Sequence, residues 1–430
     1  MKLPNSIILA TILIAACSNE PAETRAANLD ALAAEYLFLE LSMGLHDSAH
    51  VDAYFGPEEI RANAESAALL LAEIESRAST MATRLLNWPV EPADEMQSGR
   101  VENLAERLGA LNTRIALSKG ETLSFDEESR QLFGTSAPDY DAAHFEAILE
   151  DINSLLEGEG DLSARVNRFR DQFVIPQNKL AAVFDAAIAE CRRRTLLSIE
   201  LPENESFELE YVNDKPWSGY NWYQGNSQSL IQINTDLPIF ISRAVDLGCH
   251  EGYPGHHTFN ALLEKNLVKD RGWAEFSLYP LFSPQSLIAE GSGNYGVDLA
   301  FPGSERVEFE REVLFPLAGL DPSEADRYYE LLELLSRLNY AGNEAARDYL
   351  NGTIDREQAV QWLVDYSLSS PERARQRTDF FDTYRSYVIN YNLGKDMVRD
   401  YVERDTKDHA ARWQKFEQLL SSPMSPADLL

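Results

Sequence analysis

The stretch GCHEGYPGHHTF, residues 248–259, places a His-Glu pair and two further histidines within eight positions. A hydrolytic zinc site needs about three protein ligands, an open position for water and a carboxylate that takes the proton of that water. In the usual short motif the second histidine follows four residues after the first, so both rings lie on one helix face about 6 Å apart along the axis. Here the next histidines follow after six and seven residues.

The Pro254-Gly255 pair decides whether this spacing can serve one metal. On an unbroken helix His256 would lie about 240° around from His250, and His257 would return to the same face about 10.5 Å further along the axis. Proline cannot donate to the carbonyl of His250, and glycine permits a looped-out backbone. We therefore predict a distortion that lets His250 and His256 bind one metal, with His257 beside the pocket or as the alternative ligand. A chance cluster of capping or core histidines is the competing interpretation.

Helical periodicity surrounds this stretch on both sides. Between residues 28 and 199 apolar residues return every three to four positions, for example in NLDALAAEYLFLELSMGLH at 28–46. FELEYV at 207–212 and SLIQINTD at 229–236 instead alternate, and a stretch rich in turn formers and aromatics separates them. From Leu237 the helical pattern returns. The sequence predicts a mainly α, multi-helical fold with a small antiparallel β element before the active helix, its only β-structure.

The N-terminus has the layout of a secretory signal. Residues 1–16 contain one lysine, an apolar run too short to cross a bilayer stably, and small residues before Cys17. LIAAC at 13–17 resembles a bacterial lipobox, which implies cleavage before Cys17 and lipidation of its sulfur; an ordinary signal peptide is the alternative. Because Ser18 is not an acidic retention residue, we expect an outer-membrane anchor facing the periplasm. A tether over 17–28 would then precede helical region 29–200 and catalytic region 201–430, which form one continuous domain.

The charge and the cysteine content exclude several classes of protein. The chain has 38 basic and 70 acidic residues, a formal net charge of −32. Such a surface repels nucleic acid and anionic lipid head groups, so membrane contact is expected through the lipid alone. Besides Cys17 only Cys191 and Cys249 remain, too few for a disulfide-stapled scaffold. We expect two buried thiols, which could pair only if the fold brought them together.

HEGYPGHH at 250–257 resembles the HExxPGHH signature of the zincin-like bacterial family catalogued as domain of unknown function 885. GLHD at 44–47, the aromatic-rich β segment and RSYVINYNLG at 385–394 are similar to further features of that family. The resemblance implies a zincin-like metallopeptidase fold and zinc as the cofactor. It also implies a third ligand, a glutamate in an EG-containing helix downstream.

Glu290 fits the place of that third ligand, and Glu264 and Glu275 are the competing carboxylates. The separation of 34 residues between His256 and Glu290 allows a helix, a connection and a second helix that packs back on the first. After EG this chain continues Ser-Gly-Asn-Tyr, whereas the family usually has Trp-Ala-aromatic. The expected ligand, Glu290, is present despite this difference, but the shape of the pocket is expected to differ from that of the family.

Glu251 is the expected general base, which would accept a proton from zinc-bound water and pass it to the leaving amine. Tyr387, Tyr391 or Arg385 could donate to the oxyanion, although tyrosines at i and i+4 also pack in cores. Strand 229–236 could offer an edge to an extended peptide. The cluster HDSAH at 46–50 is expected at a helix end that lines the cleft, with a separate metal site as the alternative.

The sequence thus predicts a zinc-dependent peptidase with peptides as its partners. A catalytically silent lipoprotein that binds peptides or protein partners is one alternative, and a zinc amidohydrolase that acts on other amides is another. The intact Glu251 favours an enzyme, because a silent protein has no chemical need for a base beside the metal. Endopeptidase and exopeptidase activity both remain open at this point.

Overall fold

The computed structural model describes residues 22–89 and 94–430. The expected signal peptide and Cys17 lie outside the described residues. The first helix begins at Ala22, so part of the segment expected as a tether is helical. Within the described ranges no helix has both the length and the apolar character that are needed to span a bilayer.

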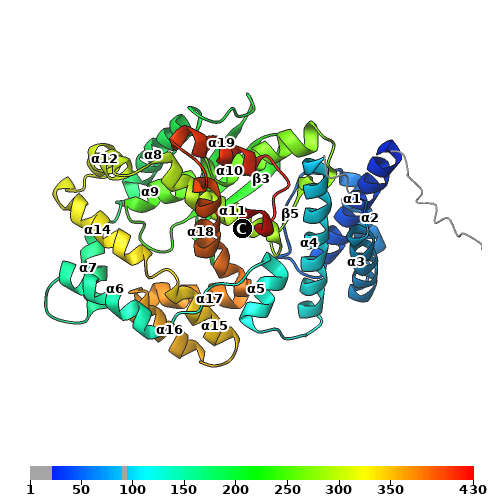
Figure 1. The fold of residues 1–430 in the computed structure, drawn as a ribbon. Helices are drawn as coiled ribbons and strands as arrows, with labels where there is room; N and C mark the ends of the chain where they lie inside the picture. The colour runs from blue at the N-terminus through cyan, green and yellow to red at the C-terminus, as the bar shows by residue number, and fades with distance from the viewer. Residues whose placement is uncertain (1–21, 90–93) are drawn as a thin grey trace, which may run out of the picture.

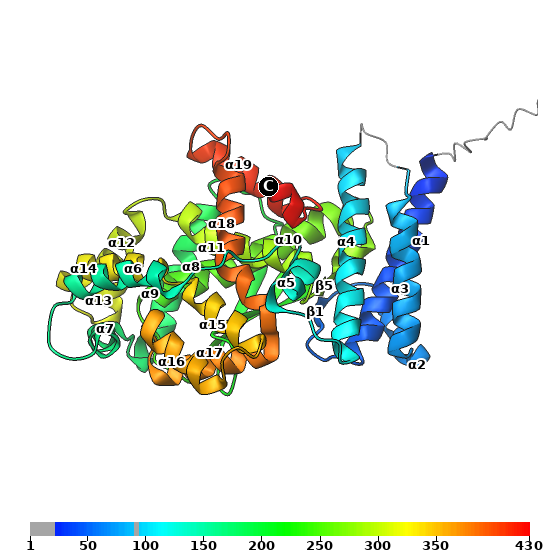
Figure 2. The ribbon, with the colours of Figure 1, turned by 60° about the horizontal axis from the view of Figure 1, so that its bottom comes forward.

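Four N-terminal helices stand together at one end of the molecule (Figure 2). They are α1 (Ala22–Gly44), α2 (Glu58–Ala67), α3 (Leu71–Leu86) and α4 (Glu95–Ser118). In α1 the buried apolar residues recur every three to four positions, which gives one apolar face that packs on similar faces of α3 and α4. The α1 face consists of Leu29, Leu32, Tyr36, Leu39 and Met43.

The remaining helices form a larger body around one extended core, in which α11 and α18 lie at the centre (Figure 1). Their bounds are α5 (Phe125–Phe133), α6 (Ala142–Leu155), α7 (Leu162–Arg170), α8 (Leu180–Thr195), α9 (Ser242–Leu247), α10 (His256–Leu263), α11 (Pro284–Ala300), α12 (Glu305–Phe309), α13 (Phe315–Ala318), α14 (Ala325–Ser336), α15 (Ala341–Leu350), α16 (Arg356–Tyr366), α17 (Pro371–Tyr384), α18 (Ile389–Glu403) and α19 (His409–Leu420). The predicted mainly α, multi-helical class is confirmed.

The β element lies where it was predicted, directly before the motif, but it is a mixed sheet. Its strands are β2 (Ser206–Val212), β3 (Gly219–Gly225) and β4 (Gln228–Asn234), in the order β2-β4-β3. β3 and β4 form an antiparallel hairpin whose turn residues Asn226 and Ser227 have φ of 54° and 58°. β2 pairs with the other side of β4 in parallel, so the expectation of an all-antiparallel element was wrong. Alternation predicts strands, whereas the pairing depends on how the connections run.

A second, two-stranded ribbon contradicts the expectation that all β-structure precedes the motif. β1 (Val51–Tyr54) pairs antiparallel with β5 (Leu278–Pro280). Strands of four and three residues are too short for alternation to reveal them. The ribbon connects the segment after α1 with the segment before α11.

The crossing of α11 and α18 is unusually close. A Cβ on Gly291 would lie 2.4 Å from the carbonyl oxygen of Gly394, and a Cβ on Gly394 would lie 2.8 Å from that of Leu287. Nearly every residue of α11 is buried, which explains why the helix has no polar face. Glycine at both crossing positions therefore allows α18 to pack closely against α11, the helix that carries Glu290.

Candidate active site

The predicted distortion at Pro254-Gly255 is confirmed. Helix α9 continues into a π-helical turn, Gly248–Gly252, and the chain leaves the helix at Tyr253 before α10 begins at His256. The amide of Gly255 donates to the carbonyl of Cys249 at 3.0 Å. A Cβ on Gly255 would lie 1.8 Å from the carbonyl oxygen of His250, so only glycine fits here. Interruption and restart of the helix bring His256 alongside His250.

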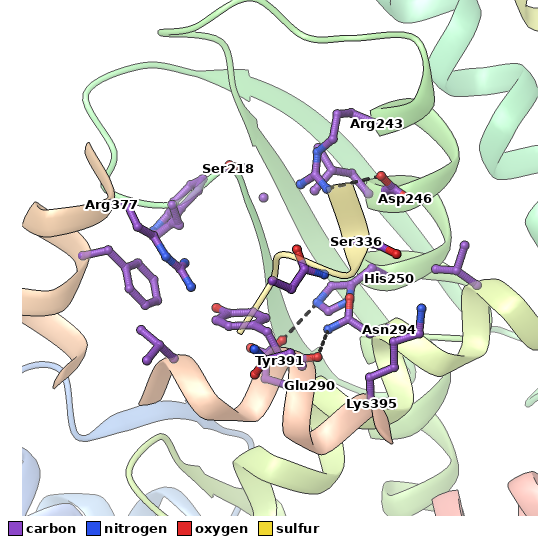
Figure 3. A pocket seen from close by; sticks show the side chains of 18 of the residues that line it. Ser218, Arg243, Asp246, His250, Glu290, Asn294, Ser336, Arg377, Tyr391 and Lys395 are labelled. Atoms are coloured by element: carbon purple, nitrogen blue, oxygen red, sulfur yellow. Dashed lines mark hydrogen bonds and ion pairs between the residues drawn. The ribbon is translucent and has the colours of Figure 1, made fainter. Parts of the chain in front are cut away.

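Three side chains converge at this break. The rings of His250 and His256 have centroids 4.6 Å apart and are nearly perpendicular, at 83°. Nε2 of His250 lies 3.2 Å from Oε2 of Glu290, and Nε2 of His256 lies 3.7 Å from the same oxygen. Potential ligand atoms of the three residues lie within 4.8 Å of one another. Figure 3 shows His250 and Glu290 meeting on one side of the pocket.

The two carboxylate oxygens of Glu290 differ in their hydrogen bonding. Tyr387 donates its hydroxyl proton to Oε1 at 2.7 Å. Oε2 is buried and has no hydrogen bond of regular geometry within the described part of the chain, although His250 is close. Burial alone would raise the pKa of Glu290, but His250 and His256 hold it well below its usual range. An ionised oxygen without a hydrogen bond, facing two imidazoles, fits a metal ligand.

The charge around His256 also fits a cation site. Burial acts to lower its pKa, but the carboxylates of Glu290, Glu251 and Asp52 raise the pKa of His256 to about 9. These acidic groups therefore favour positive charge at this point, which a divalent metal would supply. Two imidazoles, one carboxylate and room for water form a common donor set of catalytic zinc.

Glu251 follows the first histidine and is buried. Burial raises the pKa of its carboxyl, although His250 and His256 counteract this. A Cβ on Gly219 of β3 would lie 2.8 Å from Oε1 of Glu251, so the strand approaches the carboxylate closely at this glycine. The side-chain amide of Asn221 donates to the backbone carbonyl of Glu251 at 2.7 Å. The sheet thereby positions the predicted base.

The three candidate oxyanion donors have different hydrogen-bond and ion-pair partners in the structure. Tyr391 lines the pocket, and within the described residues its hydroxyl has no hydrogen-bond partner. The hydroxyl of Tyr387 is engaged by Glu290. Arg385 lies outside the pocket lining, because it pairs at 2.8 Å with Glu128, a buried carboxylate of α5 that needs a counter-charge. Of the three, the structure leaves only Tyr391 free to meet a substrate.

His257 points away from the three converging residues. Its Nδ1 lies 2.9 Å from the hydroxyl of Ser229, and its Nε2 lies 3.1 Å from Glu205. The ring is fully buried between the sheet and α10. Consecutive helical residues differ by about 100° in direction, so His256 and His257 cannot both face the pocket.

The competing carboxylates and the HDSAH cluster also lie elsewhere. Glu264 accepts hydrogen bonds from Tyr223 and from the turn of the β3–β4 hairpin. Glu275 pairs with Arg100 at 2.5 Å. His50 pairs with Glu40 in the interior between α1 and β1, and the cluster does not line the pocket as expected.

Asp52 and Tyr220 are pocket residues close to the candidate metal-binding side chains that were not predicted from the sequence. Asp52 of β1 accepts a hydrogen bond from the hydroxyl of Tyr220 on β3. Burial, together with Glu290 and Glu251, raises the pKa of Asp52 to about 7, although His256 acts to lower it. The turn-rich stretch that contains Tyr220 was recognised as part of the β element, but no sequence signal places Asp52 next to it.

The three converging residues border a cavity of about 1090 Å³. Residues 216–221, at the start of β3, form part of its lining, and residues of α17 and α18 form another part. Among the described strands β3 is an edge of its sheet, whereas strand 229–236, predicted as the edge, is central. The edge that borders the cavity thus belongs to the aromatic-rich strand.

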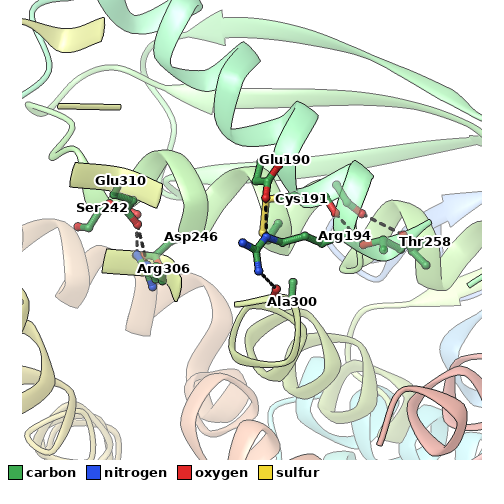
Figure 4. The surroundings of a disulfide bond; sticks show 12 residues. Glu190, Cys191, Arg194, Ser242, Asp246, Thr258, Ala300, Arg306 and Glu310 are labelled. Atoms are coloured by element: carbon green, nitrogen blue, oxygen red, sulfur yellow. Dashed lines mark hydrogen bonds and ion pairs between the residues drawn. A yellow bond between two sulfur atoms is a disulfide. The ribbon is translucent and has the colours of Figure 1, made fainter. Parts of the chain in front are cut away.

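Cys191 and Cys249 form a disulfide, in place of the two thiols that were expected. A Cβ on Gly248 would lie 3.2 Å from the side chain of Ile188, so α8 packs closely against the π-helical turn and brings the sulfurs together. Figure 4 shows Arg194 beside the disulfide, where it pairs with Glu190 at 2.7 Å and donates to the carbonyl of Ala300 at 2.9 Å. The covalent link ends directly before His250.

Comparisons with known proteins give similarity in fold at low sequence identity. No family model and no curated protein matches the sequence. A protein from Colwellia psychrerythraea, provisionally described as a lipoprotein, is 14% identical with a TM-score of 0.54, over 83% of this chain and 69% of that one. This similarity shows the fold alone.

Two further solved structures are more distant. An M32 carboxypeptidase from Deinococcus radiodurans R1 is 12% identical with a TM-score of 0.42, over 91% of this chain and 89% of that one. A lipoprotein of unknown function from Shewanella oneidensis, also provisionally described as such, is 11% identical with a TM-score of 0.41, over 94% and 79%. At these scores neither supports an argument about the site.

Proposed function

We propose that this chain is a zinc-dependent peptidase of the zincin-like family catalogued as domain of unknown function 885. His250, His256 and Glu290 would hold the metal. The observation that carries the proposal is Oε2 of Glu290, a buried carboxylate oxygen that meets two imidazoles and has no hydrogen bond of regular geometry to any described residue. The family assignment rests on the resemblance of HEGYPGHH and stays a proposal.

Bound zinc would supply a Lewis acid and an activated water. Glu251 would accept a proton from the attacking water, and burial, which raises its pKa, suits a base that later returns the proton to the leaving amine. Tyr387 would hold Glu290 in its ligating orientation through Oε1. The hydroxyl of Tyr391 would donate to the developing oxyanion.

The cavity and its strand favour a peptide over a small amide. A volume of about 1090 Å³ lies at the upper end of the range of small-molecule sites and leaves room for a peptide. The edge of β3 borders this cavity, and an extended peptide can add its backbone hydrogen bonds to such an edge. We therefore place the amidohydrolase second.

Glu251→Gln tests the chemistry and separates an enzyme from a silent binder. The variant keeps shape and hydrogen-bonding capacity but cannot accept the proton, so it should fold, retain one zinc and lose about 10²–10⁴-fold in peptide hydrolysis. Zinc is measured by elemental analysis and hydrolysis with a peptide library. A wild type that binds peptides as tightly as the variant and cleaves none would support the silent binder instead.

The ligand assignment has its own test. His256→Ala should remove stoichiometric zinc, because it deletes one of three converging ligands. His257→Gln should retain zinc, since its ring contacts Ser229 and Glu205. The reverse pattern would contradict the assignment.

We also propose that Cys17 is the first mature residue and carries the lipid anchor, on the strength of LIAAC at 13–17. Attachment to the outer membrane, facing the periplasm, is the expected location. Mass spectrometry of the mature protein should find an acylated N-terminal cysteine in the membrane fraction. An unmodified N-terminus at another residue would reject the anchor.

A further inference from the structure

Arg377, on α17, lines the same cavity as the proposed zinc ligands. Its guanidinium carbon lies 5.0, 5.6 and 5.8 Å from the ring centroids of Phe380, Phe381 and Tyr391. Figure 3 shows the side chain pointing from its helix into the pocket, toward Tyr391. The aromatic rings hold the charged group in place without hydrogen bonding to it.

This arginine has no hydrogen bond and no ion pair within residues 22–89 and 94–430, in a chain with 70 acidic residues. Other basic residues of the cavity do have carboxylate partners: Arg306 pairs with Asp246, Lys395 with Asp298 and Arg399 with Asp396. Because this half-buried guanidinium lines an open cavity, its unpaired donors are left to water or to a molecule that enters the cavity. The side chain can therefore bind an acidic group of such a molecule.

Arg170 and Arg373 also lack a carboxylate partner among the described residues, but their surroundings differ. Both stack on Phe240, and Arg373 donates to the carbonyl of Pro238 at 2.6 Å. Arg377 instead packs against Tyr391, the proposed oxyanion donor, with its guanidinium carbon 5.8 Å from the centroid of that ring. A group bound by Arg377 would thus lie beside the side chain that is proposed to meet the reacting carbonyl.

We propose that Arg377 binds the C-terminal carboxylate of the substrate and that the protein is a carboxypeptidase. Guanidinium and carboxylate form paired, charge-assisted hydrogen bonds, and the planar fork of arginine fixes the orientation of the carboxylate. The inference rests on the proposed peptidase function and deepens it. Phe380 and Tyr391, which pack around Arg377, would contact the last residue of the substrate.

The reaction is an ordinary hydrolysis of the last peptide bond. The water oxygen forms a bond to the carbonyl carbon, and the bond from that carbon to the nitrogen of the terminal residue breaks. The proton removed from water reaches this nitrogen through Glu251. One free amino acid and a peptide shorter by one residue are the products.

The first experiment compares peptides that differ only at the C-terminus. The zinc-loaded full chain should release the last residue from a peptide acid and act at least about 100-fold more slowly on the same peptide as its amide. Arg377→Gln should lower kcat/KM for the acid by about 100-fold or more and change that for the amide less than about threefold. Arg375→Gln, an exposed arginine on the same helix that does not line the cavity, should behave as wild type.

The second experiment measures binding without turnover. In the zinc-loaded Glu251→Gln background, calorimetry should find that N-acetyl-Ala-Phe binds at least about tenfold more tightly than its amide, and adding Arg377→Gln should abolish this difference. A preference for the acid that survives Arg377→Gln would show that the carboxylate binds elsewhere, for example on the metal, and would overturn the proposal.

A protein that is not a carboxypeptidase and a protein that is not a peptidase would give different results. Wild type that binds zinc and cleaves internal bonds of acid and amide peptides alike would keep the peptidase and reject the carboxypeptidase. Wild type that hydrolyses no peptide would reject the proposed function and with it the carboxypeptidase. The calorimetric comparison would then decide only whether Arg377 binds carboxylates.

Discussion

Tyr387 and Tyr391 are four residues apart and face the same pocket, yet the structure gives their hydroxyl groups different partners. Tyr387 donates to Glu290, whereas the hydroxyl of Tyr391 is free within the described residues. A hydrogen bond to a ligand's second oxygen orients the ligand, while a free donor in a cavity can meet the substrate.

Removing each hydroxyl should therefore change a different quantity. Tyr387→Phe should weaken zinc affinity about 10–100-fold, because Glu290 loses the donor that orients it. Tyr391→Phe should leave zinc affinity unchanged and lower kcat about 100-fold. Competition with a metal-binding dye measures the affinity, and peptide hydrolysis at saturating zinc measures kcat. Equal effects of both substitutions on zinc would contradict the division of roles.

Glu106 on α4 shows how one carboxyl links stability to pH. Its Oε2 is buried without a hydrogen-bond partner in the described part of the chain. Burial and the nearby Asp428 raise its pKa to about 7, although Ser425 opposes this. The folded state thus retains a proton that the unfolded chain loses near pH 4.5. Stability from this group is fully present below that pH and is lost as the pH rises to about 7.

Glu106→Gln should therefore stabilise the protein at pH 8 and change its stability little at pH 4. Allowing for partial solvent screening, the gain at pH 8 is about 1 kcal/mol. Thermal unfolding at both pH values measures it, and Glu121→Gln, at an exposed position just after α4, is the control. A gain that is equal at both pH values would exclude this linkage.

Among the elements, the crossing of α11 and α18 determines the site most directly. Gly291 follows Glu290, and a side chain there would meet the backbone of Gly394 rather than a flexible group. Helix α18 carries Tyr391, and Tyr387 lies just before its start. A small increase in the separation of the two helices would therefore move these tyrosines relative to Glu290.

Gly291→Ala should destabilise the fold by about 3 kcal/mol and weaken zinc binding, since the backbones must move apart. Gly109→Ala is the matched control, because Gly109 is an exposed position inside α4 with no neighbouring atom within 4 Å of the added Cβ. It should stabilise the protein by up to about 1 kcal/mol. Urea unfolding and zinc titration report both effects. A Gly291→Ala variant as stable as wild type would contradict the close crossing.

At the scale of the whole molecule, the disulfide joins the N-terminal half of the chain to the motif. Cys191 and Cys249 are 58 residues apart, and the closed loop contains β2, β3 and β4. Replacing both cysteines by alanine should lower the free energy of unfolding by about 2–4 kcal/mol, mainly through the freer unfolded chain. The same variant should retain its zinc when folded, because neither sulfur is a ligand.

Urea midpoints of the oxidised, reduced and doubly substituted proteins check this prediction. Reduction of the wild type should reproduce the loss seen in the variant. If reduction leaves the midpoint unchanged, the two cysteines do not pair in the protein.

Much of this protein was evident in the sequence because the determining signals are local. The periodicity of 28–199 fixes helices whose apolar faces must be buried, and the alternation at 207–212 and 229–236 fixes strands before the motif. The break at Pro254-Gly255 follows from backbone chemistry, since proline lacks a donor and Gly255 alone fits against the carbonyl of His250. Each of these features depends on residues that are close together in the chain.

Only the tertiary structure decided which distant side chains meet. The parallel pairing of β2 with β4 and the ribbon of β1 with β5 depend on how the connections run. The pairing of Cys191 with Cys249 depends on the packing of α8 against the motif. Arg385, predicted at the site, forms an ion pair with Glu128 instead. Arg377, which no sequence pattern marks, lines the cavity. Such contacts join residues that are tens to hundreds of positions apart, so their energies are set by packing and charge pairing in the folded molecule, which no local pattern encodes.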